Sequence, residues 1–108
     1  MDMRAFDDLA EETLDGLFEA IDAAIGDDVD VDFDNGILTI ELQDGRQYVI
    51  NKHAPSQELW VSSPVSGAAH YAFDQGGGTW ISTRGGAALV TVLAIELGQV
   101  TGASVNLT

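Results

Sequence analysis

The sequence contains no cysteine. A disulfide, a thiolate metal site, cysteine ligation of an iron–sulfur cluster and a cysteine nucleophile are therefore excluded. Bases are scarce too, with four lysine and arginine residues against 18 aspartate and glutamate residues and a net charge of −14. No apolar run approaches the roughly 20 residues that a membrane-spanning helix needs. We expect a protein of a reducing compartment that binds neither nucleic acid nor a membrane.

Acidic residues are instead concentrated near the N-terminus. Thirteen of the 18 carboxylates lie within residues 1–34, where Arg4 is the only base. A local field of this kind attracts cations and basic protein surfaces and repels phosphates. An acidic start is also unlike the basic region of a secretory signal, so we expect a soluble, cytoplasmic, most simply bacterial protein. With 45% hydrophobic residues in 108, the chain can fill one core, which predicts a single domain over residues 1–108.

An apolar stripe at helical spacing predicts a helix over residues 3–25, with Asp2 as its N-cap and Gly26 at its end. Like charges three or four residues apart destabilise a helix by a few tenths of a kcal/mol per pair, roughly, unless a cation offsets them. The opposite side of this helix carries such a series: Asp8, Glu12, Asp15, Glu19 and Asp22.

Residues 29–34 alternate between apolar and acidic, which predicts a strand with one wet face. The Asn35-Gly36 pair that follows is a strong hairpin signal, and residues 37–42 form the second strand. A two-residue turn places Phe33 opposite Leu38 and Asp30 opposite Glu41.

Further strands are expected at residues 46–53, 58–64, 69–74 and 79–82. A final helix is expected over residues 86–101, with Ser82 or Thr83 as its cap and Gly102 at its end. Helices that flank a meander can both cover one face of the sheet. We therefore predict an α+β two-layer sandwich, in which N- and C-terminal helices pack on one face of an antiparallel sheet of five to six strands.

The stretch YVINKHAPSQELW (48–60), followed by VSSPVSG (61–67) and HYAFD (70–74), resembles the frataxin family, including its bacterial CyaY-type members. The resemblance rests on fixed spacing: a proline three residues after the lysine of INK, a tryptophan five residues later, then SSP-x-SG and an aromatic strand. The TWIS strand (79–82), the last helix and the acidic first helix follow in family order.

The resemblance implies that iron, ferrous or ferric, binds on an acidic ridge, with weak binding of other divalent cations. It also implies docking on the cysteine desulfurase and the iron–sulfur scaffold protein through the ridge and the exposed sheet. The sheet residues implied are Asn51, Glu58, Trp60 and His70. The family commonly has glutamine at the position of Glu58, a base near His70 and an acid at Ala72, so these departures bear on scaffold binding. The ridge corresponds to Asp7, Asp8, Glu11, Glu12, Asp15, Glu19, Asp22, Asp27, Asp28, Asp30, Asp32 and Asp34.

Carboxylate oxygens suit hard cations such as magnesium, calcium, manganese and ferrous iron. Exposed carboxylates diverge around a helix, so we expect several weak sites completed by water; the alternative is a solvated acidic face that binds no metal. Residues 30–41 nearly match the calcium loop of an EF-hand, but the sixth position is Asn35 rather than glycine and the flanks alternate as strands.

The alternation of the sheet places Trp60 and Asn51 on the wet face and Tyr48 in the core. An exposed tryptophan suggests a protein contact, and the alternative is a tryptophan half covered by its neighbours. Trp80 is expected in the core. We interpret His53 and His70 as ordinary surface residues.

The first hypothesis is therefore a non-enzymatic binding module that presents ferrous iron to, or regulates, iron–sulfur cluster assembly. The alternatives are a ferroxidase or iron-storage activity at the ridge, and an acidic module that binds a basic partner without metal. No Glu-x-x-His pair is present for a di-iron centre of the bundle type. We expect a monomer, with oligomers induced by metal.

Overall fold

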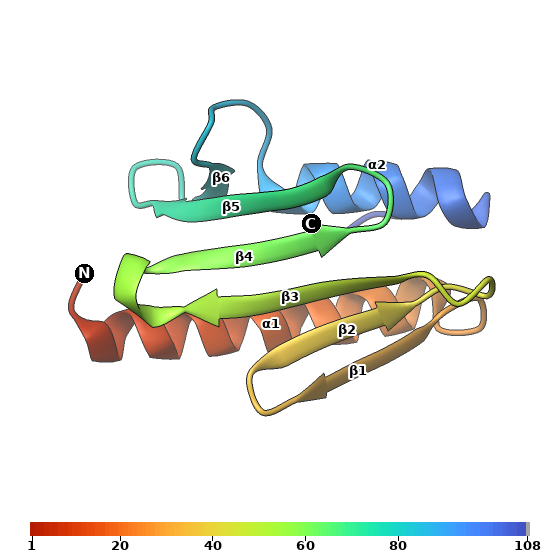
Figure 1. The fold of residues 1–108 in the computed structure, drawn as a ribbon, viewed down its shortest axis with the longest axis horizontal. Coiled ribbons are helices and arrows are strands. Elements are labelled where there is room, and N and C mark those ends of the chain that lie inside the picture. Colours follow the sequence, from red (N-terminus) through yellow and green to blue (C-terminus); the bar gives the residue numbers. More distant parts are fainter. Residues whose placement is uncertain (108) are drawn as a thin grey trace.

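Two helices flank six strands along the chain in the computed structural model, which describes residues 1–107 (Figure 1). A single 3-10 turn, η1, joins the third and fourth strands. No helix in this part of the chain is long and apolar enough to cross a lipid bilayer. The elements are α1 (Met3–Ile25), β1 (Asp30–Asp34), β2 (Ile37–Glu41), β3 (Gln47–His53), η1 (Ala54–Ser56), β4 (Glu58–Ser63), β5 (Gly67–Asp74), β6 (Thr79–Ser82) and α2 (Leu89–Thr101).

The six strands form one antiparallel sheet in the order β1-β2-β3-β4-β5-β6. The Asn35-Gly36 turn has φ values of 52° and 75°, as a two-residue hairpin turn requires. Phe33 pairs with Leu38 and Asp30 with Glu41, so the predicted register is confirmed. Every connection between neighbouring strands is short, which gives the meander predicted from the sequence.

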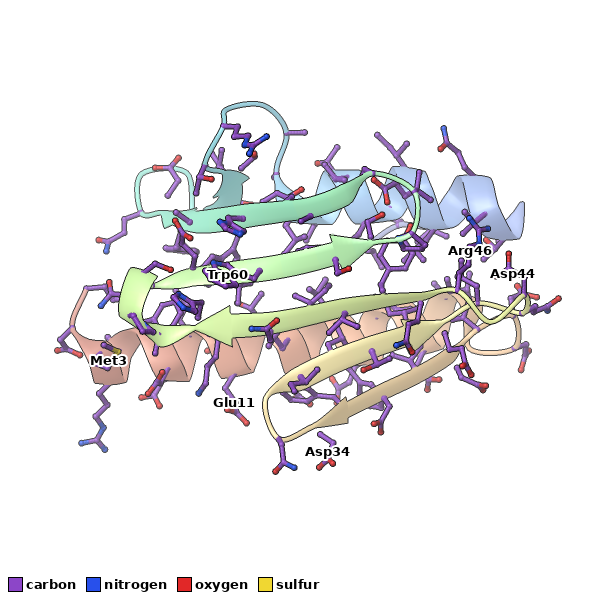
Figure 2. The ribbon with its side chains drawn as sticks, viewed as in Figure 1. Met3, Glu11, Asp34, Asp44, Arg46 and Trp60 are labelled. Carbon is purple, nitrogen blue, oxygen red and sulfur yellow. The ribbon has the colours of Figure 1, made fainter. Side chains whose placement is uncertain are left out.

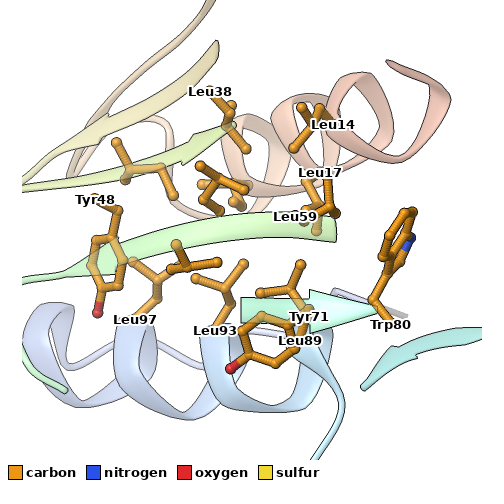
Figure 3. Close-up of a cluster of buried hydrophobic side chains, with 14 of the residues drawn as sticks. Leu14, Leu17, Leu38, Tyr48, Leu59, Tyr71, Trp80, Leu89, Leu93 and Leu97 are labelled. Carbon is orange, nitrogen blue, oxygen red and sulfur yellow. The ribbon is translucent and has the colours of Figure 1, made fainter. Parts of the chain in front are cut away.

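Both helices lie on the same face of the sheet, and the predicted two-layer α+β class is confirmed (Figure 1). Helix α1 packs on β1, β2 and β3, whereas α2 packs near β6. The core between the layers includes Leu14 of α1, Leu59 of β4 and Leu93 of α2, all at most 1% exposed (Figure 3). The second face of the sheet is uncovered by any helix, and Trp60 projects from it (Figure 2).

Helix α1 begins where the sequence predicts. The Asp2 side chain accepts a hydrogen bond of 2.8 Å from the backbone N–H of Ala5, and Gly26 follows the last helical residue. The stripe Phe6, Ala10, Leu14, Leu17, Ile21 and Ile25 is buried. This helix is amphipathic, and its apolar side sets which acids reach solvent.

Helix α2 begins later than predicted, and neither Ser82 nor Thr83 is its N-cap, although it ends at Gly102 as predicted. The chain turns at Gly85 and Gly86, whose φ values of +85° and +112° are incompatible with a helix. Ala88 then takes an extended conformation as N-cap and offers no side-chain hydrogen bond. The strand limits agree with prediction to within two residues; Gly67, for example, starts β5 instead of preceding it.

Candidate metal-binding edge and docking face

The acids of α1 lie on one flank and the outer side of the helix. At 3.6 residues per turn, the other flank carries Leu9, Thr13 and Gly16, which line a groove of about 310 Å³ together with Glu12, Val90 and Leu107. Asp7 is half-buried at the margin of the core stripe. The remaining acids of the predicted helical ridge are exposed: Asp8, Glu11, Glu12, Asp15, Glu19 and Asp22.

The acids of β1 border the same edge of the molecule. Strand β1 is the edge strand of the sheet, and α1 packs against it. Glu11 and Asp34 accordingly appear along one side of the molecule in Figure 2. Asp30, Asp32 and Asp34 are exposed and alternate with half-buried apolar residues, so they project toward the open face while the helical acids belong to the helix layer. The acids of α1 and those of β1 therefore lie along the same edge of the molecule. The first set lies in the helix layer, and the second set faces the open side of the sheet.

Four carboxylates line a small hollow where α1 gives way to β1. The hollow has a volume of about 150 Å³ and is lined by Asp27, Asp28, Asp30 and Glu41, together with Gly26, Val29, Leu42 and Gln43. We call these four acids the acidic hollow. Glu41 was missing from the predicted ligand set, although its place opposite Asp30 could be read from the hairpin register.

A neighbouring cavity of about 350 Å³ contains Asp44 and Arg46 beside Asp28. The backbone N–H of Arg46 and its guanidinium both donate to Asp44, at 3.0 Å and 2.7 Å, and these bonds hold the pKa of the Asp44 carboxyl below its usual value. The carboxylate of Asp44 is therefore already paired with Arg46.

Within residues 1–107, no three acidic or histidine side chains are arranged to hold one metal ion. The acids proposed as ligands thus lie along α1, the α1–β1 turn and β1 without forming a closed coordination sphere, and Glu12 borders the groove on the other flank of α1. Such an arrangement can attract a hard cation and bind it through one or two carboxylates, with water completing the coordination.

Lys52 supplies positive charge to this edge, which the sequence reasoning missed. Its Nζ lies 3.6 Å from Oδ1 of Asp7 and 4.0 Å from Oε2 of Glu11. Tyr48 and Ile50 of the same strand face the core, so the period of two could have placed Lys52 on the helix side. Lys52 therefore offsets negative charge at Asp7 and Glu11, which are not among the five acids for which repulsion was expected.

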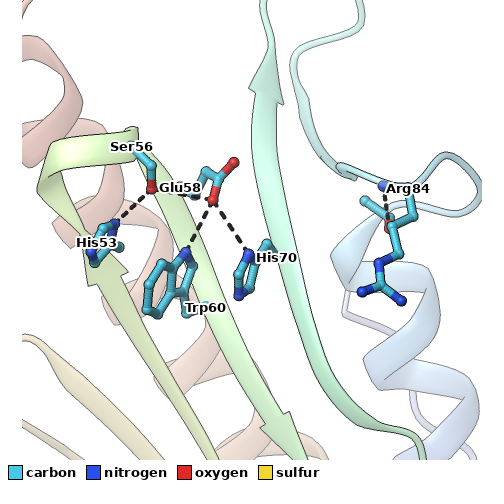
Figure 4. Close-up of polar contacts among 7 residues, drawn as sticks. His53, Ser56, Glu58, Trp60, His70 and Arg84 are labelled. Atoms are coloured by element: carbon cyan, nitrogen blue, oxygen red, sulfur yellow. Dashed lines mark hydrogen bonds and ion pairs between the residues drawn. The ribbon is translucent and has the colours of Figure 1, made fainter.

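Trp60 is enclosed by two histidines on the open face of the sheet (Figure 4). Its ring stacks on His53 with centroids 3.7 Å apart and an interplanar angle of 11°, and on His70 at 4.4 Å and 7°. Trp60 does point away from the core, but it is half-buried, as the alternative interpretation had it. His70 is exposed and His53 is half-buried, as expected for residues of the sheet surface, but their stacking on Trp60 was not predicted.

A chain of polar contacts runs beside this stack and ends at Glu58 (Figure 4). Ser56 Oγ lies 2.7 Å from His53 Nδ1 and donates to Glu58 Oε1 at 3.2 Å. The same oxygen accepts from Trp60 Nε1 at 3.0 Å and lies 3.6 Å from His70 Nδ1. Glu58 thus orients three neighbours through one carboxylate oxygen.

Asn51 lies beside Trp60 as its partner across β3 and β4, on the open face where it was predicted. Its Nδ2 donates to the backbone carbonyl of Lys52 at 3.2 Å. A hollow of about 190 Å³, lined mainly by apolar surface, is bordered by Trp60, Asn51, Val49 and Ala68. The open face therefore has a stack of three rings beside a shallow apolar hollow. Both features are typical of protein–protein contacts.

Comparison with known proteins places this architecture in a family. Residues 1–103 match the model of a frataxin-like domain. The iron–sulfur cluster assembly protein CyaY of Neisseria meningitidis serogroup B is 38% identical over 96 residues, which are 86% of this chain and 87% of that protein. The mitochondrial frataxin homolog of Schizosaccharomyces pombe is 39% identical over 95 residues, or 84% of this chain, and the chain spans only 60% of that relative.

Solved structures give the same result. A frataxin from Psychromonas ingrahamii superposes with a TM-score of 0.88 at 27% identity, covering 100% of this chain and 99% of that one. Trimeric frataxin from Saccharomyces cerevisiae, complexed with ferrous iron, superposes with a TM-score of 0.71 at 31% identity, covering 94% of this chain and 88% of the yeast chain. The order of elements, the open sheet face and these matches show that the chain belongs to the frataxin family.

Proposed function

We propose that this protein binds ferrous iron on its acidic edge and presents it to, or regulates with it, the assembly of iron–sulfur clusters. The Neisseria relative is an iron–sulfur cluster assembly protein, and the yeast relative has been solved with ferrous iron. Both are similar to this chain over most of its length. No chemical step on a substrate is part of the proposal.

The observation that carries the proposal is the gathering of carboxylates at the β1 edge. Thirteen acids precede residue 35, and those of α1, the α1–β1 turn and β1 border one side of the molecule. Oxygen ligands in an open arrangement suit ferrous iron that must be bound and then released. The acidic hollow adds a depression lined by four acidic residues at this edge.

The docking part of the proposal assigns the open sheet face to the scaffold protein and the acidic edge to a basic surface of the cysteine desulfurase. Asn51, Glu58, Trp60 and His70 all lie on that open face, within the rows that cross β3, β4 and β5. An aromatic side chain at the centre of a contact contributes much of its binding energy. Charge complementarity at the edge would mainly raise the association rate.

Anaerobic titration with ferrous iron, followed by NMR, tests the metal part. The amides of α1, of residues 27–34 and of Glu41 are expected to broaden before those of β5 and β6. A variant with Asp27→Asn, Asp28→Asn and Asp30→Asn is the matched control and should shift the effect to higher iron. Sharp amides throughout residues 1–41, with broadening elsewhere, would contradict the proposal. Oxygen consumption in the same samples would reveal a ferroxidase.

A pull-down with the desulfurase and the scaffold protein, with and without ferrous iron, tests the docking part. Trp60→Ala should lose the scaffold and keep the desulfurase, whereas the triple Asp→Asn variant should weaken the desulfurase. Equal capture by all three proteins would refute this division of surfaces. Light scattering on the same samples should report a monomer without metal and larger assemblies only after iron is added.

A further inference from the structure

Lys52 is a base placed where the core pattern of β3 would continue. Tyr48 and Ile50 are buried beneath the helix layer, and Lys52 is the next residue on that side of the strand. Its stem runs past the β1–β2 turn, since Cε lies 3.9 Å from the position that a Cβ on Gly36 would take. The ammonium therefore emerges in the seam between α1 and the first hairpin.

Two helical carboxylates converge on that ammonium. Asp7 and Glu11 are one turn apart on α1, and their oxygens lie 3.6 Å and 4.0 Å from Nζ. Oδ1 of Asp7 is shielded from solvent and has no hydrogen-bond partner within residues 1–107, so Lys52 is the group that compensates it. A cation that binds here must displace an ammonium that the chain itself holds in place.

The acidic hollow is different in this respect. Within the described chain, no ion pair reaches Asp27, Asp28, Asp30 or Glu41, and Arg46 in the neighbouring cavity is engaged by Asp44 at 2.7 Å. The two ends of the acidic edge thus have similar carboxylate ligands, but only the end with Asp7 and Glu11 is paired with a lysine. A free cation meets no internal competitor at the hollow.

We propose that Lys52 is a tethered counter-ion that competes with divalent cations for Asp7 and Glu11, and so directs them first to the acidic hollow. The inference rests on the proposed function and names the residue that sets the order in which the edge is loaded. An exposed ion pair is weak, so the competition is a bias that a divalent ion overcomes at higher concentration. The order of loading would place the first ion at the turn between α1 and β1, away from the N-terminal end of the helix.

Manganese titration of the full chain, followed by amide broadening, tests this. Manganese prefers the same oxygen ligands as ferrous iron and does not require anaerobic handling. In the wild type, the amides of Asp28 and Glu41 should broaden at lower manganese than those of Asp7 and Glu11. In Lys52→Gln, Asp7 and Glu11 should respond at about 3- to 10-fold lower manganese, the gain expected from freeing two exposed ion pairs, while the hollow is unchanged.

Two matched variants separate the counter-ion from net charge. Arg84→Gln removes the same charge from the exposed loop before α2 and should leave the ratio of the two responses at its wild-type value. Lys52→Arg keeps the charge and should also behave as wild type. An unchanged ratio in Lys52→Gln, or an equal change in Arg84→Gln, would overturn the inference.

The outcome also distinguishes this inference from the function on which it rests. If manganese and ferrous iron broaden no amide of residues 1–41 in either wild type or Lys52→Gln, the proposed function is overturned together with it. If the wild type responds and Lys52→Gln loads in the same order, only the role of Lys52 is overturned. The amide spectrum without metal checks that each variant keeps the fold.

Discussion

Glu96 is a carboxylate on the apolar side of α2, and it is only 7% exposed. Three hydroxyl groups donate to it: Tyr48 at 2.9 Å, Ser63 at 2.7 Å and Ser66 at 2.7 Å. A buried carboxylate is tolerated only with such partners, because desolvation is otherwise costly. The network ties α2 to β3, β4 and the β4–β5 turn.

Tyr48→Phe should change the dependence of stability on pH. Burial and the hydrogen bond to Glu96 raise the pKa of Tyr48 well above its usual value of 10.0. The unfolded chain therefore loses this proton first, so the free energy of unfolding falls as pH rises above about 10. The variant should lose about 1 kcal/mol at neutral pH, for the missing hydrogen bond, and decline less steeply between pH 10 and 11.

Urea unfolding at a series of pH values measures both effects. Ser66→Ala is the control, because it removes a donor to Glu96 without removing a phenol. It should lose stability at neutral pH and keep the alkaline slope of the wild type. Identical alkaline slopes in Tyr48→Phe and the wild type would show that ionisation of Tyr48 does not cause the loss of stability above pH 10.

His70→Ala should uncover one face of Trp60. The parallel ring at 4.4 Å is lost, which costs about 0.5–1.5 kcal/mol for an aromatic pair. Acrylamide should then quench the tryptophan fluorescence more strongly than in the wild type. The indole N–H resonance of Trp80, which donates to Thr13 Oγ1 in the core, should not move and serves as the internal reference. Unchanged quenching would mean that the His70 ring does not shield Trp60.

Side-chain positions were predictable where strand alternation decides them. Trp80 was assigned to the core and Trp60 to the open face, and both assignments are confirmed. The partners of Lys52 and Glu96 were not predictable, because they lie 30 or more residues away in the chain. A period of two or of 3.6 gives the direction of a side chain but not what meets it.

The two helices differ in how their first turns are satisfied. Asp2 caps α1 with a side-chain hydrogen bond, whereas Ala88 at the corresponding position of α2 has no side-chain acceptor. The first N–H groups of a helix lack intrahelical partners, so a capping oxygen stabilises it. Helix α2 instead gains its stability from burial of Leu89, Leu93 and Leu97.

Ala88→Ser should therefore stabilise the protein by about 1 kcal/mol. Ala88 already has the extended conformation of an N-cap, with φ −70° and ψ 153°, so a hydroxyl can reach the second or third N–H of α2 without backbone change. Asp2→Ala is the matched opposite and should lose about the same amount. Chemical denaturation measures the free energy of unfolding of both variants. A loss of stability in Ala88→Ser would show that the first turn of α2 does not lack a capping hydrogen bond.

At the level of elements, the sequence determined the first hairpin better than the second helix. Asn35-Gly36 and the alternation of β1 fixed both turn and register, because each depends on neighbouring residues alone. The start of α2 depends instead on the turn at Gly85 and Gly86 and on the pairing of Ile81 with Ala88, which joins that turn to β6. The acids of β1 followed from the hairpin, but the acidic hollow required the α1–β1 turn to be placed in space.

The charge of the whole molecule is one-sided, and this should govern its stability. The net charge is −14, and thirteen of the 18 acids lie within residues 1–34, where Lys52 approaches Asp7 and Glu11. Self-repulsion among these acids should be reduced by any salt through screening, and further by a divalent cation that binds the folded state. For a domain of this size, about 1 kcal/mol corresponds to a shift in Tm of about 4–8 °C.

Thermal unfolding in sodium chloride and in magnesium chloride at equal ionic strength separates screening from binding. We expect Tm to rise by several degrees in sodium chloride and by more in magnesium chloride, since magnesium can bridge carboxylates. The triple variant Asp27→Asn, Asp28→Asn and Asp30→Asn should have a higher Tm at low salt and a smaller difference between the two salts. A melting curve indifferent to both salts would mean that the acidic edge stores no repulsion, and the physical reason for cation binding there would be lost.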